Sequence, residues 1–180
     1  MGLYWAFQEG VEVNGETVLA VVEGMGRFKH LAFEILADHG ITAPRAGAWY
    51  SQQAWLDAFR DIGDRLGPAS LLQIGKKIPQ LAQWPQGVQD IHQALASIDV
   101  AYHLNHRGGE IGTYRYEALG PRTGRMTCRN PYPCDFDQGI LLGIARRFCP
   151  PDSALLEIPH RPEDPCRKRG AEECTYLLEW

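Results

Sequence analysis

The stretch Glu110–Asn130, EIGTYRYEALGPRTGRMTCRN, marks the point where the chain changes from a helical to an alternating pattern. In its first half, Tyr114 and Tyr116 fall on one face of an extended segment, whereas Arg115 and Glu117 fall on the other. The turn sequence GPRTG then leads into RMTCRN. Alternation on both sides of a turn rich in glycine and proline predicts a β-hairpin.

Downstream of the hairpin, the sequence predicts one helix and two further strands. Residues 135–148, DFDQGILLGIARRF, place apolar side chains at helical spacing, with an aspartate at the start to cap the helix and two prolines after it. The segments ALLEIPH (154–160) and CTYLLEW (174–180) are predicted strands. The second half is therefore expected to be a four-stranded antiparallel sheet of β-β-α-β-β order.

The first half of the chain has helical periodicity. Apolar residues repeat at intervals of three and four along 18–36 as one stripe, and again along 51–66, 69–77 and 87–98, with the third segment ending before Pro79. The sequence thus predicts an α+β fold with N-terminal helices packed on the sheet. At 180 residues we expect a single domain, with a helical half to residue 99 and an α+β half from residue 100.

Composition limits the partners and the compartment. The net charge of −4 gives no reason to expect direct nucleic-acid binding or an anionic membrane surface. The first residues carry no basic signal-peptide region, and no apolar run is long enough to cross a bilayer. We therefore expect a cytoplasmic protein, in which five cysteines are more often used for metal binding or chemistry than for disulfides.

Four of the cysteines lie in or beside predicted turns: Cys128, Cys134, Cys166 and Cys174. Zinc prefers thiolate and imidazole ligands in a closed tetrahedron, so these thiols are candidate ligands. Their spacings, C-x5-C and C-x7-C, are wider than the C-x2-C of zinc fingers, so a redox pair (Cys128/Cys134 or Cys166/Cys174) or unreactive cysteines remain alternatives. Glu163, three residues before Cys166, is a further candidate ligand.

Aromatic residues near the ends of predicted elements suggest an apolar pocket for an aromatic or tetrapyrrole-like ligand. The candidates are Trp49, Tyr50, Trp55, Trp84, Tyr102, Tyr114 and Tyr116. His103 and His106 are expected on a loop or strand edge as a polar pair, although a histidine ligand to haem iron would give the same pattern. The sequence has no nucleophile elbow, P-loop or dinucleotide fingerprint, so an enzyme is the less favoured interpretation.

The sequence CRNPYPCDFDQGILLGIARRF, followed later by EDPCRKRGAEECTYLLEW, resembles the four-vinyl reductase domain family over about residues 100–180. Members of that family have helices followed by the β-β-α-β-β order. The family is named for a role in chlorophyll-type pigment synthesis, and it also forms the effector-sensing part of activators that respond to phenols and xylenes. In those sensors a glutamate and three cysteines hold a structural zinc beside an enclosed aromatic-binding pocket.

The resemblance places the sensors' E-x2-C-x7-C motif on Glu163, Cys166 and Cys174. The remaining cysteine corresponds to Cys134 or Cys128, which leaves the fourth ligand open. The resemblance implies a sensory or regulatory domain with a structural zinc, a small hydrophobic or aromatic ligand, and a homodimer or partner signalling protein as its output. The alternatives are a tetrapyrrole carrier or reductase, an iron–sulfur cluster on the four thiols, a thiol redox sensor and a haem-based sensor.

Overall fold

In the computed structural model, which describes residues 2–153, 158 and 160–180, helices dominate the first hundred residues. The elements up to the middle of the chain are β1 (Glu12–Asn14), α1 (Gly15–Gly24), the 3-10 turn η1 (Gly26–Phe28), α2 (Lys29–Asp38), β2 (Trp49–Ser51), α3 (Gln52–Leu66) and α4 (Pro68–Leu81). The rest are α5 (Ile91–Ala96), α6 (Ile98–Leu104), β3 (His106–Arg107), β4 (Thr113–Gly120), β5 (Thr123–Arg129), α7 (Cys134–Phe148), η2 (Arg167–Arg169) and β6 (Cys174–Glu179). The prediction of an α+β fold is confirmed.

The predicted hairpin is present as β4 and β5, and β6 pairs antiparallel with the other edge of β5. Cys128 on β5 lies opposite Tyr114 on β4 and opposite Cys174 on β6. The expectation of a four-stranded sheet is wrong, because within the described residues this sheet has the order β4-β5-β6. The strand expected at 154–160 falls mainly on residues outside the described part of the chain.

A second small sheet was not predicted. Its order is β2-β1-β3, and Val13 pairs with both Tyr50 and His106. Its strands are only two or three residues long, so none of them is long enough to show an alternating pattern. This sheet holds the start of α1 and the end of α6 together.

Helix boundaries differ from the predicted ones at three places. The single apolar stripe of 18–36 is split into α1 and α2 around Gly26, whose φ of +50° lies in the left-handed region. The helix expected to end before Pro79 continues to Leu81, because a proline in the last turn removes only one helical hydrogen bond. The helix expected at 87–98 is two helices separated at Ser97, and α6 includes His103, which was expected on a loop or strand edge.

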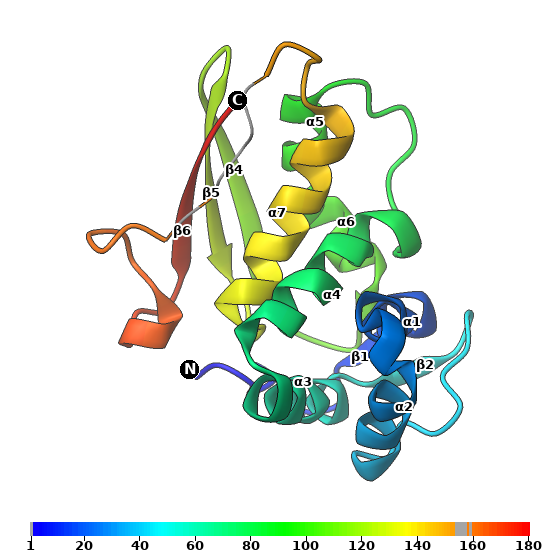
Figure 1. Cartoon of the computed structure of the whole chain (residues 1–180). Helices are drawn as coiled ribbons and strands as arrows, with labels where there is room; N and C mark the ends of the chain where they lie inside the picture. The colour runs from blue at the N-terminus through cyan, green and yellow to red at the C-terminus, as the bar shows by residue number, and fades with distance from the viewer. Residues whose placement is uncertain (1, 154–157, 159) are drawn as a thin grey trace.

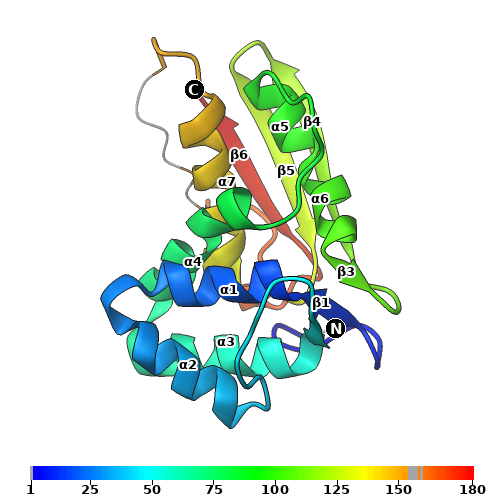
Figure 2. The same ribbon diagram turned by 90° about the vertical axis from the view of Figure 1, so that its right-hand side faces the viewer.

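Helices α4 and α7 cross closely near the centre of the molecule (Figure 1). A Cβ on Gly75 would lie 2.2 Å from the carbonyl oxygen of Phe136, and one on Gly139 would lie 2.3 Å from that of Leu72. The two glycines therefore allow backbone-to-backbone contact. Viewed from the side, α5, α6 and α7 lie near the β4-β5-β6 sheet, while α1, α2 and α3 form the opposite end of the molecule (Figure 2). No described helix combines the length and apolar character that crossing a bilayer demands.

Candidate functional site

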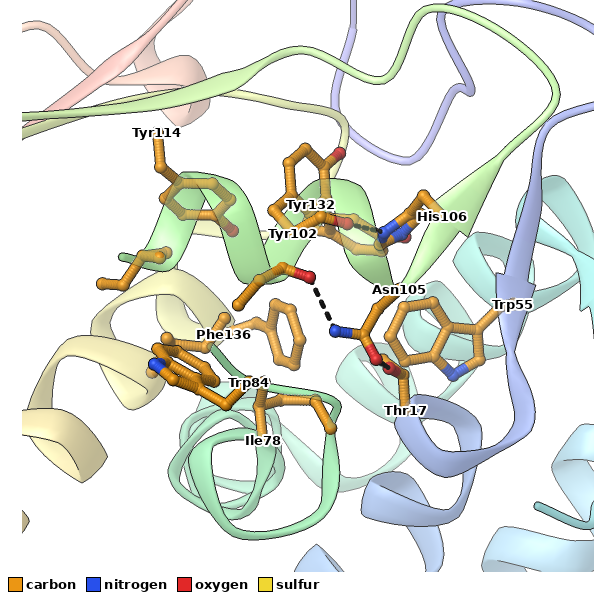
Figure 3. Close-up of a pocket in the computed structure, with 14 residues that line it drawn as sticks. Thr17, Trp55, Ile78, Trp84, Tyr102, Asn105, His106, Tyr114, Tyr132 and Phe136 are labelled. Carbon is orange, nitrogen blue, oxygen red and sulfur yellow. Dashed lines mark hydrogen bonds between the residues drawn. The ribbon is translucent and has the colours of Figure 1, made fainter. Parts of the chain in front are cut away.

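A small apolar cavity lies where α6 and the start of β4 face α4, α7 and α3. Its volume is about 30 Å³, enough for one or two water-sized atoms. Trp55, Trp84, Tyr102 and Phe136 surround it from different elements (Figure 3). The complete lining is Thr17, Trp55, Ile78, Ala82, Trp84, Ile98, Ala101, Tyr102, Asn105, His106, Tyr114, Tyr132, Phe136 and Ile140.

Polar side chains along one wall form a continuous hydrogen-bond relay. Gln52 donates from Nε2 to the hydroxyl of Tyr132 at 3.0 Å, and that hydroxyl lies 2.6 Å from His106 Nε2. His106 Nδ1 lies 2.8 Å from the carbonyl oxygen of Tyr102, which can only accept, so Nδ1 carries the proton and Nε2 accepts from Tyr132. Burial lowers the pKa of His106 to about 4, so the imidazole is neutral at physiological pH.

Two further polar groups of the lining are also satisfied. The hydroxyl of Tyr102 donates to the carbonyl of Ile111 at 2.5 Å. The side chain of Asn105 donates to the carbonyls of Gln83 and Ala101, and its Oδ1 accepts from Thr17 at 3.2 Å. Asn105 therefore joins the end of α6 to α1, and these lining groups are already engaged within the protein.

Only part of the predicted aromatic set lines the cavity. Four members line the cavity: Trp55, Trp84, Tyr102 and Tyr114. The other three lie elsewhere: Arg107 lies over the ring of Trp49, Tyr50 accepts a hydrogen bond from the backbone of Arg45, and Tyr116 contacts His92 Nδ1 at 2.6 Å. Sequence reasoning missed Tyr132 and Phe136 as lining residues and treated His106 as a polar loop residue. A signal that could have located α6 is the helical spacing of Ile98, Tyr102 and Asn105, which was not used.

Three cysteines and a histidine converge at a second place, and none of the four lines the cavity. The Sγ atoms of Cys134, Cys166 and Cys174 and a ring nitrogen of His160 all lie within 4.8 Å of one another. Cys134 begins α7, Cys174 begins β6, and Cys166 precedes η2. Of the predicted ligands, Cys128 and Glu163 are not in this group: Cys128 is buried within β5, and Glu163 is exposed.

The cluster's thiols are close but not bonded to one another. Cys134 Sγ lies 3.2 Å from Cys174 Sγ and 3.8 Å from Cys166 Sγ, whereas a disulfide requires about 2.05 Å. The hydrogen bond between the two sulfurs raises the pKa of Cys134 and lowers the pKa of Cys174, and the neighbouring His160 and Arg167 lower the pKa of Cys174 further. The lowered pKa of Cys174 and the raised pKa of Cys134 mean that Cys174 ionises first.

His160 was not predicted as part of the site. Both of its ring nitrogens are buried and have no hydrogen-bond partner among the described residues, while its ring packs 4.3 Å from that of Tyr176. A buried polar atom without a partner costs free energy of folding, so a ligand is expected at one of the two ring nitrogens. Three thiols and one imidazole form a common ligand set for zinc, and tetrahedral ligands at about 2.3 Å place sulfurs roughly 3.8 Å apart.

A buried ion pair lies between the cluster and the cavity. Arg167 and Asp137 form a salt bridge with side chains only 4% and 0% exposed. Arg167 also donates from Nε to Cys174 Sγ at 3.2 Å, and Asp137 accepts from the hydroxyl of Tyr114 at 2.6 Å. Asn130 completes the network by contacting both members of the pair. The sequence predicted either Asp135 or Asp137 as the helix cap and did not predict this role of Asp137.

No protein-family model matches the chain, and no curated protein sequence matches it. Among solved structures, a triple mutant of an H-NOX (haem-nitric oxide/oxygen binding) protein from S. oneidensis in the Fe(II) state is similar, with a TM-score of 0.69 and 16% identity over 92% of this chain and 95% of that one. The H-NOX protein of K. algicida, as an Fe(II) unliganded mutant, has a TM-score of 0.61 and 14% identity over 92% and 95% of the two chains.

A third similar structure, described as showing modulation of haem redox potential through protein-induced porphyrin distortion, has a TM-score of 0.61 and 15% identity over 93% and 99% of the two chains. These comparisons correct the proposed resemblance to the four-vinyl reductase family, since the similar structures are H-NOX domains. The chain has the H-NOX fold. The motif CRNPYPC and the C-x7-C spacing were insufficient to distinguish two families that both place helices before a C-terminal sheet.

Proposed function

We propose that this chain is a sensory domain with the H-NOX fold that works without haem. In this proposal its input is a small neutral ligand in the aromatic cavity, and the Cys134, His160, Cys166 and Cys174 cluster holds a structural zinc. Its output passes through a homodimer or a partner protein. The observation that carries the proposal is that a cavity of only about 30 Å³ lies in a fold whose similar structures are haem proteins.

The described residues do not fit a haem. Cofactor pockets usually measure roughly 300–1,000 Å³, about ten times the volume of this cavity or more. The space is instead filled by Trp55, Tyr102, Tyr132 and Phe136. His106 supplies the imidazole of the lining, and both of its nitrogens are already hydrogen bonded. The lining contains no arginine or lysine that could pair with the two carboxylates of a haem.

The lining defines the class of ligand that the cavity accepts. The phenols, the imidazole and the Asn105 amide of the lining already have partners, whereas the indole N–H of Trp55 is buried with none among the described residues. A ligand there is therefore recognised mainly by shape and apolar contact, and the Trp55 N–H is the one free donor that these lining groups offer it. Trp84 lines this cavity and also a surface groove formed by Pro79, Pro85 and Phe148, so it separates the cavity from solvent. We propose that displacement of the Trp84 indole admits ligands as large as one aromatic ring.

The zinc site is proposed as a structural clasp. Its four ligands come from separate segments, so a metal would tie the start of α7 to the loop before η2 and to the start of β6. All four coordination positions are filled by protein, which is the pattern of structural zinc sites. The predicted four-thiol cluster is not assembled, because Cys128 is absent from the group.

A thiol redox sensor is the second candidate function, and one observation favours it. The 3.2 Å contact between Cys134 and Cys174 is close enough for disulfide formation after a small movement, if an oxidant accepts two electrons. This pair differs from the Cys128/Cys134 and Cys166/Cys174 pairs expected from sequence. Zinc would protect both thiols, so the two functions are alternatives for the same atoms.

The decisive experiment is purification from cells supplied with haem precursor, followed by elemental analysis and an absorption spectrum. The proposal predicts one zinc per chain and no Soret band. A stoichiometric Soret band would overturn the haem-independent function, and metal-free reduced protein would overturn the clasp. Titration with benzene or phenol, followed by the indole N–H signals of Trp55 and Trp84, tests the ligand class. Trp5, which is exposed, and Trp49, which lies outside the cavity lining, serve as internal controls.

A further inference from the structure

We infer that the buried Asp137–Arg167 pair is a positioning pair that couples the Cys/His cluster to the aromatic cavity. The inference deepens the proposed function and rests on it for the role of the two sites. It assigns a regulatory task to two residues that contribute neither a cluster ligand nor a cavity-lining atom. The argument depends on the contacts at each end of the pair and on its burial.

At the cluster end, Arg167 contacts Cys174 twice. Its backbone N–H donates to Cys174 Sγ at 3.4 Å, and its Nε donates to the same sulfur at 3.2 Å. Two hydrogen bonds to one sulfur fix both the backbone and the guanidinium of Arg167, so the position of Arg167 depends on the location of this sulfur. Binding or loss of a metal would move the sulfur that orients the guanidinium.

At the cavity end, Asp137 holds a tyrosine of the lining. Its Oδ1 accepts from the Tyr114 hydroxyl at 2.6 Å, and the ring of Tyr114 lies 5.1 Å from that of Tyr102 in an edge-to-face arrangement. Tyr102 in turn lies 4.5 Å from His106. A shift of the Asp137 carboxylate is therefore transmitted to three aromatic rings around the cavity, of which Tyr114 is the first.

Burial makes the pair move as a unit. With both side chains almost fully inaccessible, neither charge can exchange its partner for water, and separating them would leave an uncompensated charge in the interior. The guanidinium uses its remaining N–H groups on Asn130. A reorientation of Arg167 at Cys174 thus requires Asp137 to follow. Coupling of this kind is reciprocal, so a ligand that moves Tyr114 also changes the zinc affinity of the cluster.

The test uses the full chain and the aromatic ring signals of Tyr102 and Tyr114 in NMR spectra. In the wild type, removal of zinc by a chelator, or Cys174→Ser, is expected to shift both signals by more than their line widths. In Asp137→Asn, the same treatments are expected to shift them at least threefold less. Asp135→Asn is the matched control, because Asp135 lies in the same helical turn but pairs with Lys168 at the surface.

Equal shifts in the wild type and in Asp137→Asn would overturn the inference, as would unshifted tyrosine signals in wild type after zinc removal. Should Asp137→Asn fail to fold, Tyr114→Phe provides the second arm. It removes the hydrogen bond to Asp137 but keeps the ion pair, and the signal of Tyr102 should become insensitive to the cluster. Elemental analysis distinguishes failure of this inference from failure of the proposed zinc site. If the natural cluster contains no zinc, Cys174→Ser can still shift the tyrosine signals and so still tests the coupling.

Discussion

At the scale of single residues, His106 makes the stability of the protein depend on pH. Its pKa falls from 6.5 in the unfolded chain to about 4 in the folded protein because the imidazole is buried. Between these two values the unfolded chain binds more protons than the folded one, so stability falls as pH is lowered through this window. We expect this residue to account for a loss of about 2 kcal/mol between pH 7.5 and pH 5.

The prediction is measured by urea unfolding of the wild type and His106→Gln at the two pH values. The substitution lowers stability at neutral pH, since it disturbs the contact with Tyr132, but it should remove about 2 kcal/mol of the pH-dependent loss. His103→Gln is the control, because the side chain of His103 is half-exposed on α6. Equal acid sensitivity in wild type and His106→Gln would contradict the assignment of a neutral, buried imidazole.

Sequence reasoning identified some site residues and not others for a physical reason. Cys134, Cys166 and Cys174 could be predicted as candidate ligands because few residue types bind metals, but their wide spacing could not separate them from Cys128. His160 could not be predicted, because a lone histidine in a proline-rich segment has no pattern that distinguishes it. The pairing of Asp137 with Arg167 depends on a contact across thirty residues, and an aspartate at a helix start predicts a cap equally well.

At the scale of elements, the crossing of α4 and α7 depends on the two facing glycines. Gly139→Ala would place a methyl group 2.3 Å from the carbonyl oxygen of Leu72, which is backbone and cannot rotate away. The helices must separate, and we expect a loss of about 1–3 kcal/mol in the free energy of unfolding, the usual cost of overpacking a core. Gly75→Ala should cost a similar amount, because its Cβ would meet Phe136 O at 2.2 Å.

Gly63→Ala in the interior of α3 provides the matched control. Its nearest neighbour would be Leu71 Cδ1 at 3.2 Å, the flexible end of a side chain. The gain in helix propensity from glycine to alanine is about 1 kcal/mol, so this variant should be neutral or slightly more stable. Chemical denaturation of the three variants checks the comparison. If the Gly139→Ala protein were as stable as Gly63→Ala, the backbones of α4 and α7 would not be in close contact at Gly139.

The length and periodicity of each element decided whether it could be predicted. Long elements with a clear period, such as α3, α7 and the β4–β5 hairpin, could be located from the sequence to within a few residues. The β2-β1-β3 sheet could not, because strands of two or three residues are defined by their partners and not by their own pattern. At Pro79 the sequence predicted a helix end that the structure does not have. Proline usually ends a helix, but this one lies inside the last turn of α4.

At the scale of the whole molecule, the Cys/His cluster joins α7 to the segments around η2 and β6, so metal binding should stabilise the entire fold. A ligand that binds only the folded state at a free concentration one hundred times its Kd adds about 2.7 kcal/mol. For a chain of this length we expect a rise in Tm of roughly 5–11 °C between chelated and zinc-saturated protein, measured by calorimetry under strong reductant. Cys149→Ser should behave like the wild type, because Cys149 lies at the end of α7 outside the cluster.

The zinc-dependent rise in Tm can also identify the fourth ligand of the cluster. His160→Ala and Glu163→Gln alter the two competing candidates, which lie three residues apart on the same segment. Because the His160 ring nitrogens are buried beside the three thiols whereas Glu163 is exposed, His160→Ala should lose most of the zinc-dependent rise in Tm and Glu163→Gln should keep it. The reverse result would assign the site to the glutamate. An identical, zinc-independent Tm in both variants and in the wild type would mean that the cluster does not join these segments through a metal.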